Sequence, residues 1–331
     1  MSSRDVPLDW HGQRLDRFVA DMWPEHSRTY WQRAIARGQV TLDGKLARAG
    51  VPLKAGQRVG IECGQESGAG AILEPQGLSL REWPSWVVYH DPEVMVVNKP
   101  RGLVVHPSRG HWDDSVVSRL LPWLPAEAGE LRPGVVHRLD RDTTGLMMLA
   151  RTVQAKALLS QAIQEREVIR EYLAVVRGHM HPSRGAIDAP LGRNPNNRLK
   201  MAVVLGGRSA RTYYRTVATW HSASLVQFRL ETGRTHQIRV HCASLGHPVL
   251  GDTLYGGRHP LLKLGQMLHA GRLQFVHPTD HRLMEFVEGP PEDWAGLSVL
   301  GESRIVEPTL YPDRADPSTK AWLNQLGVFS V

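Results

Sequence analysis

Five charged or titratable residues crowd into six positions at 137–142, where the sequence reads HRLDRD between apolar residues. The flanking runs GVVHRLD and GLMMLAR predict two strands joined by the polar loop RDTT, which puts Asp140 at the rim of a sheet. Asp140 could cap the turn, a role that suits Asp142 better. It could belong to a kinase-like HRD loop, but the other kinase motifs are missing from the sequence. It could also be a nucleophile or base that an arginine keeps ionised.

A second cluster, LETGRTHQIRVHCASLGHP, covers residues 230–248. It predicts a strand, a turn and then a helix capped by Thr235 and ended by Gly246. The spacing predicts that the buried face of this helix carries Ile238, Cys242 and Leu245. Arg239 lies on another face with His236, three positions away. Because an arginine does not lose its proton in proteins, Arg239 is suited to keep an active-site carboxylate charged, although a purely structural salt bridge predicts the same contact.

The third segment, REYLAVVRG at 170–178, alternates like a strand and carries Tyr172. A tyrosine in a strand usually belongs to the core. An RNA base turned out of its stack nevertheless needs an aromatic surface to rest on, and Tyr172 would offer a ring with a hydroxyl group.

The elements around these clusters alternate in type. Strand-like runs at 86–91, 94–100 and 103–107 precede a helical run at 152–166, which indicates an α+β domain. An earlier unit has helical spacing at 14–23 and at 27–38, with Ser27 and Gly38 as its caps, followed by two short strands. The predicted organisation is a small module at 14–62, a Gly/Ser-rich linker at 63–81, a catalytic domain at 82–300 and an unassigned tail at 301–331.

The charge favours a polyanionic partner. The 331-residue chain carries a net charge of +7, and residues 27–58 hold seven basic residues against the single acid Asp43. Residues 184–215 again hold seven basic residues and one acid, Asp188. Only two cysteines occur, far apart in the sequence, which fits a reducing cytoplasm. The chain shows no signal peptide and no apolar run long enough to span a membrane, so we expect neither export nor anchoring.

Several motifs together resemble one enzyme family. The chain is similar to RluA-type RNA pseudouridine synthases, in particular to their RluD-like branch, over residues 14–290. The first unit also resembles the small RNA-binding module of ribosomal protein S4. The motifs that carry the likeness to the synthases are NKPRGLVVHP, GVVHRLDRDTTGLMMLA, REYLAVVRG, LETGRTHQIRVH, HPVLGDTLYGG and LHAGRLQFVHP.

This resemblance implies a mixed, mainly antiparallel sheet with a central RNA cleft, and isomerisation of uridine to pseudouridine without a cofactor. It implies that Asp140 is the catalytic aspartate, Arg239 its ion-pair partner and Tyr172 the stacking tyrosine. The implied substrate is large-subunit ribosomal RNA, free or in pre-ribosomal particles, with transfer RNA as the alternative, and we expect a monomer. The residues expected to contact RNA are His137, Arg138, Arg234 and His236 near the catalytic site and Arg28, Arg33, Arg37 and Lys45 in the first module.

Two other functions compete with this interpretation. A non-catalytic RNA-binding or ribosome-assembly protein would show the same basic surfaces but would not need Asp140 and Arg239. The 16 histidines raise the idea of a metal-dependent nuclease. The pairs His106/His111 and His236/His241 lack a nearby group of carboxylates at ligand spacing, so we expect no metal site. Activity in the presence of a chelator would separate the three functions.

Overall fold

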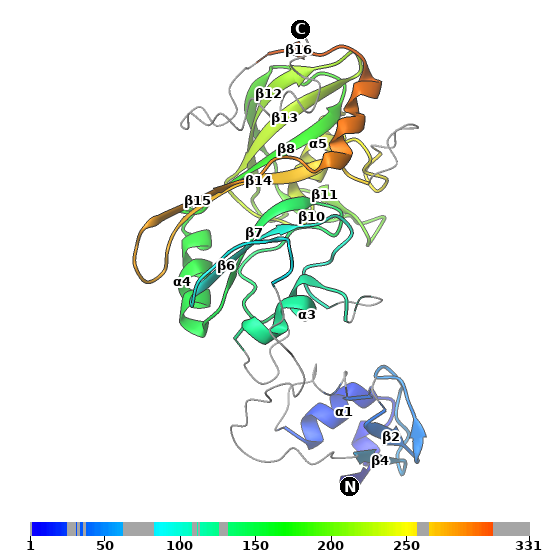
Figure 1. Cartoon of the computed structure of the whole chain (residues 1–331). Coiled ribbons are helices and arrows are strands. Elements are labelled where there is room, and N and C mark those ends of the chain that lie inside the picture. The colour runs from blue at the N-terminus through cyan, green and yellow to red at the C-terminus, as the bar shows by residue number, and fades with distance from the viewer. Residues whose placement is uncertain are drawn as a thin grey trace. The chain divides into compact units, whose positions relative to one another are not determined.

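The chain divides into two compact units in the computed structural model (Figure 1). The structure describes residues 2–24, 31, 34–35, 38–61, 83–107, 111, 113–125, 132–256 and 265–306. In this description the first unit runs to Ile61 and the second begins at Trp83.

The first unit is a four-stranded antiparallel sheet in the order β1-β4-β2-β3 with α1 packed into its core. Its elements are β1 (Ser2–Asp5), a short 3-10 helix (Leu8–Trp10), α1 (Leu15–Met22), β2 (Val40–Leu42), β3 (Lys45–Leu46) and β4 (Arg58–Ile61). Apolar residues three and four positions apart on α1, Leu15, Phe18 and Val19, are fully buried. The helix expected at 14–23 is therefore confirmed. Most of the one expected at 27–38, with Ser27, lies outside the described residues.

The second unit is built on a ten-stranded sheet with the main order β16-β12-β13-β8-β14-β7-β6-β5, while β9 pairs with β12 and β15 with β14. Only the β14–β7 pair is parallel, so the predicted mixed, mainly antiparallel sheet is confirmed. The bounds are β5 (Val87–His90), β6 (Val94–Lys99), β7 (Thr144–Ala150), β8 (Ile169–Arg177), β9 (Arg184–Asp188), β12 (Arg211–Thr219), β13 (Ala223–Leu230), β14 (Leu268–Val276), β15 (Leu283–Val287) and β16 (Arg304–Ile305).

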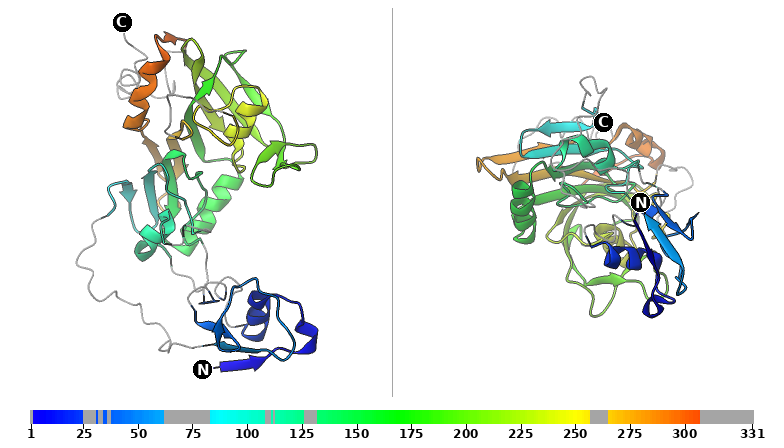
Figure 2. Two further views of the ribbon diagram at one scale, coloured as in Figure 1. Left: turned by 90° about the vertical axis from the view of Figure 1, so that its right-hand side faces the viewer. Right: turned by 90° about the horizontal axis from the view of Figure 1, so that it is seen from below.

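Short helices and one hairpin complete this unit. They are α3 (Val116–Leu120) with a 3-10 turn (Leu121–Trp123), α4 (Val153–Gln164), α5 (Gln237–Ser244), a 3-10 helix (Glu292–Leu300) and the separate pair β10 (Leu191–Arg193) and β11 (Met201–Val203). Helix α4 packs against β7, and α5 lies near β11 and β12, as Figures 1 and 2 show. The helix predicted at 152–166 is confirmed as α4. It begins after Thr152, whose hydroxyl accepts the Ala155 N–H.

Gly145 lets β14 pass close to β7. It has φ of 106°, and a Cβ atom there would lie 2.3 Å from the Ala270 carbonyl oxygen. The parallel contact between the two strands covers only the pairs His269–Thr144 and Ala270–Gly145. The approach of these strands fixes the chain that leads from Asp140 into β7.

Two predicted strands are wrong. Residues 134–140 form no ladder with β7 beyond a single bridge from Val135, because the His137 ring accepts the Met148 N–H that a pairing strand would bind. Residues 103–107 also form no strand. The chain there wraps around the buried ammonium of Lys99, which donates to the carbonyl oxygens of Pro100, Leu103 and Arg141 at 2.9 Å each.

Candidate active site

Asp140 stands at the end of the irregular segment 134–140, just before β7. Its carbonyl oxygen accepts the Thr143 N–H at 3.2 Å, which closes the turn. Its carboxylate is 17% exposed, so it reaches the surface of the cleft but is largely enclosed by protein. A carboxylate in this position needs a cation nearby to remain charged.

Arg239 on α5 supplies that cation. Its Nη1 donates to Asp140 Oδ2 at 2.8 Å, while Nε and Nη2 bind both oxygens of Asp252 at 2.7 and 3.0 Å. Burial opposes the charge, but the hydrogen bonds and charges of Asp252 and Asp140 raise the pKa of Arg239 above its usual value. The structure therefore brings Asp140 and Arg239 together across 99 residues of sequence.

Asp252 and Tyr255 hold Arg239 in place, and sequence reasoning did not find either role. Asp252 Oδ1 also accepts the N–H groups of Leu254 and Tyr255 at 3.0 and 3.2 Å, so one carboxylate both closes a turn and grips the guanidinium. The Tyr255 ring centroid lies 5.1 Å from Arg239 Cζ, within the range of a cation–π contact. Both residues stand in the motif HPVLGDTLYGG, but nothing in its spacing points to Arg239.

His236 borders the same carboxylate. Its Nε2 lies 3.9 Å from Asp140 Oδ1, and its Nδ1 shares a 2.8 Å hydrogen bond with the Tyr255 hydroxyl. Burial lowers the pKa of His236. The prediction that Thr235 caps α5 is wrong, since His236 occupies the cap position in the left-handed conformation with φ of 58°.

Gln237 does the capping work that was expected of Thr235. Its side-chain oxygen accepts the Arg234 N–H at 2.9 Å and the Thr232 hydroxyl at 2.8 Å. The buried face of α5 also differs from the prediction. Ile238 and Cys242 are buried, but Leu245 is 47% exposed because the helix ends at Ser244.

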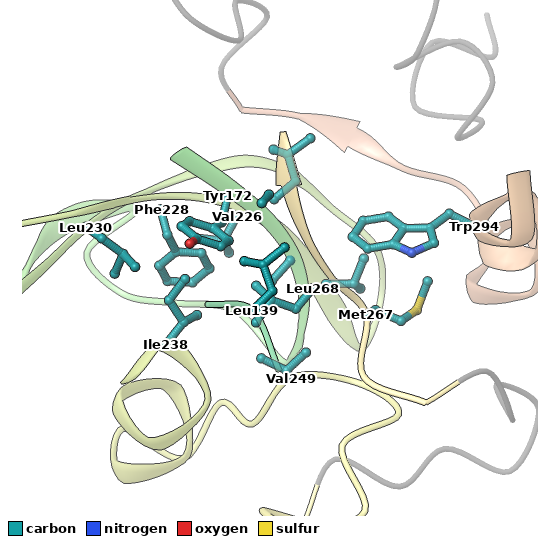
Figure 3. Close-up of a cluster of buried hydrophobic side chains, with 14 of the residues drawn as sticks. Leu139, Tyr172, Val226, Phe228, Leu230, Ile238, Val249, Met267, Leu268 and Trp294 are labelled. Atoms are coloured by element: carbon teal, nitrogen blue, oxygen red, sulfur yellow. The ribbon is translucent and has the colours of Figure 1, made fainter. Parts of the chain in front are cut away.

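Tyr172 on β8 forms part of the cleft wall. Its side chain packs among Leu139, Phe228 and other apolar residues of the core (Figure 3). It is paired across the sheet with Phe228 on β13, and only 6% of the residue is exposed. Burial raises the pKa of Tyr172, so its hydroxyl group stays protonated at neutral pH. The ring is thus held rigidly beside the carboxylate site.

These residues border one cleft with a volume of about 520 Å³. Seven of the predicted residues line it: His137, Arg138, Asp140, Tyr172, Arg234, His236 and Arg239. Lys45 is exposed in the first unit, and Arg28, Arg33 and Arg37 lie outside the described residues. Further lining cations come from Arg132, Arg166 and Arg170, while Asp140 and Glu231 are the only acidic residues of the described lining.

His137 has a structural partner. Its Nε2 accepts the Met148 N–H at 3.0 Å, and burial lowers the pKa of His137 to about 3, so the ring is neutral. The basic stretch 184–215 is also partly engaged, since Arg211 Nε donates to Asp188 at 2.9 Å and Arg215 Nε to Gln227 at 2.7 Å.

Comparison with known proteins places this geometry in a family. The RNA pseudouridylate synthase family model matches residues 93–244, and the S4 domain model matches residues 13–59. A relative from Chloroflexus aurantiacus, described as an uncharacterized RNA pseudouridine synthase, is 45% identical over 87% of this chain and 90% of its own length. The chain belongs to the RNA pseudouridine synthase family. The family expected from the motifs is thus confirmed.

Two further relatives support this membership. Ribosomal large subunit pseudouridine synthase D of Escherichia coli O157:H7 is 41% identical over 86% of this chain and 90% of its own length. Among solved structures, human RNA pseudouridylate synthase domain containing 1 is 28% identical, with a TM-score of 0.54 over 71% of this chain and 94% of that one. The synthase model covers Asp140, Tyr172 and Arg239.

Two searches of the described residues bear on the competing functions. No group of three or more His, Cys, Asp or Glu side chains in this part of the chain is placed to hold a metal ion. None of the described helices is long and apolar enough to cross a membrane.

Proposed function

We propose that this RNA pseudouridine synthase isomerises uridine in large-subunit ribosomal RNA, with Asp140 as its catalytic carboxylate. The observation that carries the assignment of the site is the 2.8 Å ion pair between Asp140 and Arg239 in a cleft that Tyr172 also lines. The substrate class is supported by relatives at 38–42% identity whose names specify the large ribosomal subunit.

The reaction detaches a base and reattaches it through another atom. The bond between C1′ of the ribose and N1 of uracil breaks, the uracil turns, and C1′ is joined to C5. Finally C5 loses its proton and N1 gains one, so the product is an isomer and no cofactor is consumed. Asp140 manages the charge at the sugar, either by attacking C1′ or by removing the proton of the neighbouring carbon to give a glycal.

The remaining residues of the site have complementary roles in this proposal. Arg239 keeps Asp140 ionised, since a nearby cation favours the charged form of a carboxylate. Tyr172 gives the extruded uracil an aromatic surface. The cleft volume of about 520 Å³ lies within the range of pockets for small ligands, which suits one nucleotide turned out of the RNA. The exposed Arg138 at the mouth positions the RNA backbone.

A pair of matched variants tests the catalytic assignment. Asp140→Asn keeps the shape of the side chain but loses its charge and nucleophilicity, so we expect no pseudouridine formation and nearly unchanged RNA affinity. Asp142→Asn is the control, since Asp142 pairs with the neighbouring Arg141 at 3.0 Å outside the cleft lining, and we expect it to keep its activity. Turnover by the Asp140→Asn variant would contradict the proposal. An active wild-type enzyme would also exclude a purely RNA-binding role.

The substrate is tested separately by mapping pseudouridines in total RNA from cells with and without the protein. Loss of modified positions in large-subunit ribosomal RNA is the expected result, and loss only in transfer RNA would redirect the proposal to that substrate. We further propose that the protein acts as a monomer in the reducing cytoplasm, in keeping with its buried free thiol at Cys242.

A further inference from the structure

Arg170 is an arginine of the cleft to which no role has yet been given. It stands on β8 two residues before Tyr172, so both side chains lie on the same face of the strand, about 7 Å apart along it. Both line the cleft together with Asp140. Only 6% of Arg170 is exposed, which places its guanidinium in the interior of the cleft wall.

Arg170 differs from the other enclosed arginines of this unit in its partners. Arg239 binds Asp140 and Asp252, Arg272 binds Glu171 and Glu285, and Arg101 binds Asp293. The Arg170 Nε is buried without a hydrogen-bond partner, and no carboxylate in the described part of the chain pairs with this guanidinium. Burying a cation in this way is costly unless some other group meets its charge.

The turn between β13 and α5 leaves room for this guanidinium. A Cβ atom at Gly233 would lie 2.8 Å from Arg170 Nη1, closer than side-chain carbons come to other atoms, so glycine permits the observed position. The φ of Gly233 is not positive, so an alanine there would strain the contact with Arg170 and not the backbone. Arg170 is thus held between the Gly233 turn and Tyr172.

We propose that Arg170 is a catalytic residue that donates hydrogen bonds to a uracil carbonyl oxygen and stabilises the negative charge that the base acquires as it leaves the sugar. This inference rests on the proposed function of Asp140 and Tyr172. A uracil stacked on Tyr172 presents an edge along β8 towards Arg170.

The chemistry of the step calls for such a group. When the C1′–N1 bond breaks, its electron pair stays with the uracil and spreads over N1 and the two carbonyl oxygens. A fixed cation in a water-poor site stabilises such developing charge more than water does, because it is already oriented before the bond breaks. The charge disappears when C5 bonds to C1′, C5 releases its proton and N1 takes one up.

The depth of Arg170 favours the base over a phosphate. The cleft lining includes Arg132, Arg138 and Arg166, which are exposed and therefore available to the RNA backbone. Arg170 is buried beside the ring on which the base would stack. A phosphate contact would change RNA affinity, whereas a contact that strengthens during bond breaking changes the rate of the bound complex.

The first test uses Arg170→Met, Arg170→Lys and a charge-matched control, Arg229→Met, whose side chain is exposed outside the cleft lining. We expect the single-turnover rate of Arg170→Met at saturating RNA to fall about 10²–10³-fold, as when a single donor to a developing oxyanion is removed. Its Kd should stay within about threefold, Arg170→Lys should recover part of the rate, and Arg229→Met should match wild type. An unchanged rate with a raised Kd and a shallower salt dependence would identify a phosphate contact and overturn the proposal.

A substrate change adds a readout that a purely structural role would not alter. In RNA with 5-fluorouridine at the target position, the fluorine withdraws charge and makes the uracil a better leaving group. The rate ratio between wild type and Arg170→Met, measured as loss of 5-fluorouridine in one turnover, should therefore be smaller than with uridine. An equal ratio for both substrates would contradict a role in stabilising the departing base.

The Gly233→Ala variant keeps the proposal testable if Arg170→Met does not fold. Its methyl group should displace the guanidinium and slow the single-turnover rate without changing Kd, whereas in the Arg170→Lys background it should add little further loss. A wild-type rate for Gly233→Ala would overturn the proposal. Asp140→Asn serves as the reference: if it is inactive while both Arg170→Met and Gly233→Ala keep the wild-type rate, only the inference about Arg170 fails. If Asp140→Asn is active, the proposed site itself falls.

Discussion

Replacing Asp252 with Asn isolates the role of the second carboxylate that binds Arg239. The asparagine oxygen can still accept the N–H groups of Leu254 and Tyr255, so the turn is kept. What is lost is the negative charge and one of the two acceptors that grip the guanidinium. Asp252 does not line the cleft, so the substitution reaches the reaction only through the position of Arg239.

The size of the effect follows from burial. The side chains of Asp252 and Arg239 are 1% and 8% exposed, and breaking a buried ion pair by removing one partner costs about 3–5 kcal/mol. Because Arg239 keeps Asp140 and one amide oxygen, we expect the free energy of unfolding to fall by about 3 kcal/mol, at the lower end of that range. A shift of about 1 Å in a catalytic group costs roughly 10²-fold in rate, so we expect the single-turnover rate to fall about 10–100-fold at an unchanged Kd.

The pH dependence separates position from charge. In the Asp252→Asn variant Arg239 still faces Asp140, so Asp140 stays ionised and raising the pH should not restore the rate. In Arg239→Leu the carboxylates of Asp140 and Asp252 remain without their cation, and such a pair holds a proton between them. Ionised Asp140 then becomes more abundant as the pH rises, so the rate of Arg239→Leu should recover between pH 6 and 9 relative to wild type.

The assay is single-turnover pseudouridine formation at saturating RNA across that pH range, with urea unfolding of each variant. Asp188→Asn is the control, because its exposed pair with Arg211 should contribute only about 0–1 kcal/mol. A wild-type rate for Asp252→Asn would show that its grip on Arg239 does not matter for catalysis. Recovery of this variant at high pH would show that Asp252 acts on charge and not on position.

Three further predictions concern other parts of the chain. Tyr172→Phe keeps the ring and loses the hydroxyl, so RNA binding should persist while turnover falls; equal loss of binding in the Phe and Ala variants would argue against stacking. Burial lowers the pKa of His137 to about 3, against about 6.5 in the unfolded chain. The unfolded chain thus binds the extra proton between these values, and the free energy of unfolding should fall as the pH drops from 6.5 to 5, by at most about 2 kcal/mol, and less in His137→Gln, as urea titrations can check. A protein that starts at Trp83 should still modify a short RNA at high concentration but bind structured RNA more weakly, with a salt slope shallower by roughly 0.7–0.9 per lost phosphate contact; identical slopes would mean that the first unit does not touch RNA.

The sequence predicts the strands and helices with clear periodicity and fails where side chains replace backbone partners. Helices α1 and α4 and strand β7 follow their apolar patterns. The segment before Asp140 has the apolar content of a strand, yet the His137 ring occupies the amide that a strand would need. Similarly, the lysine of NKPRGLVVHP organises three carbonyl groups around its ammonium instead of letting the chain extend. Periodicity reports burial and carries no information on such bonds.

The candidate site shows the same limit. The motifs pointed to Asp140, Arg239 and Tyr172 because their chemistry is explicit in the residue types. Asp252 and Arg170 were not singled out, since a turn aspartate and a strand arginine have ordinary local roles. Their importance follows only from tertiary contacts, in one case two hydrogen bonds to Arg239 and in the other a buried Nε with no described partner. Sequence spacing contains neither.

The two carboxylates on Arg239 divide the work by their exposure. Asp252 is 1% exposed and binds the guanidinium through both oxygens, so its charge is spent on holding Arg239. Asp140 is 17% exposed and receives a single hydrogen bond, through Oδ2, from the same guanidinium. Its Oδ1 has no hydrogen-bond donor among the described residues, with only His236 nearby at 3.9 Å, and it therefore remains available to a sugar in the cleft. A carboxylate gripped at both oxygens would stay charged but could not react, so the second acid lets Arg239 be fixed without consuming the reactive oxygen of the first.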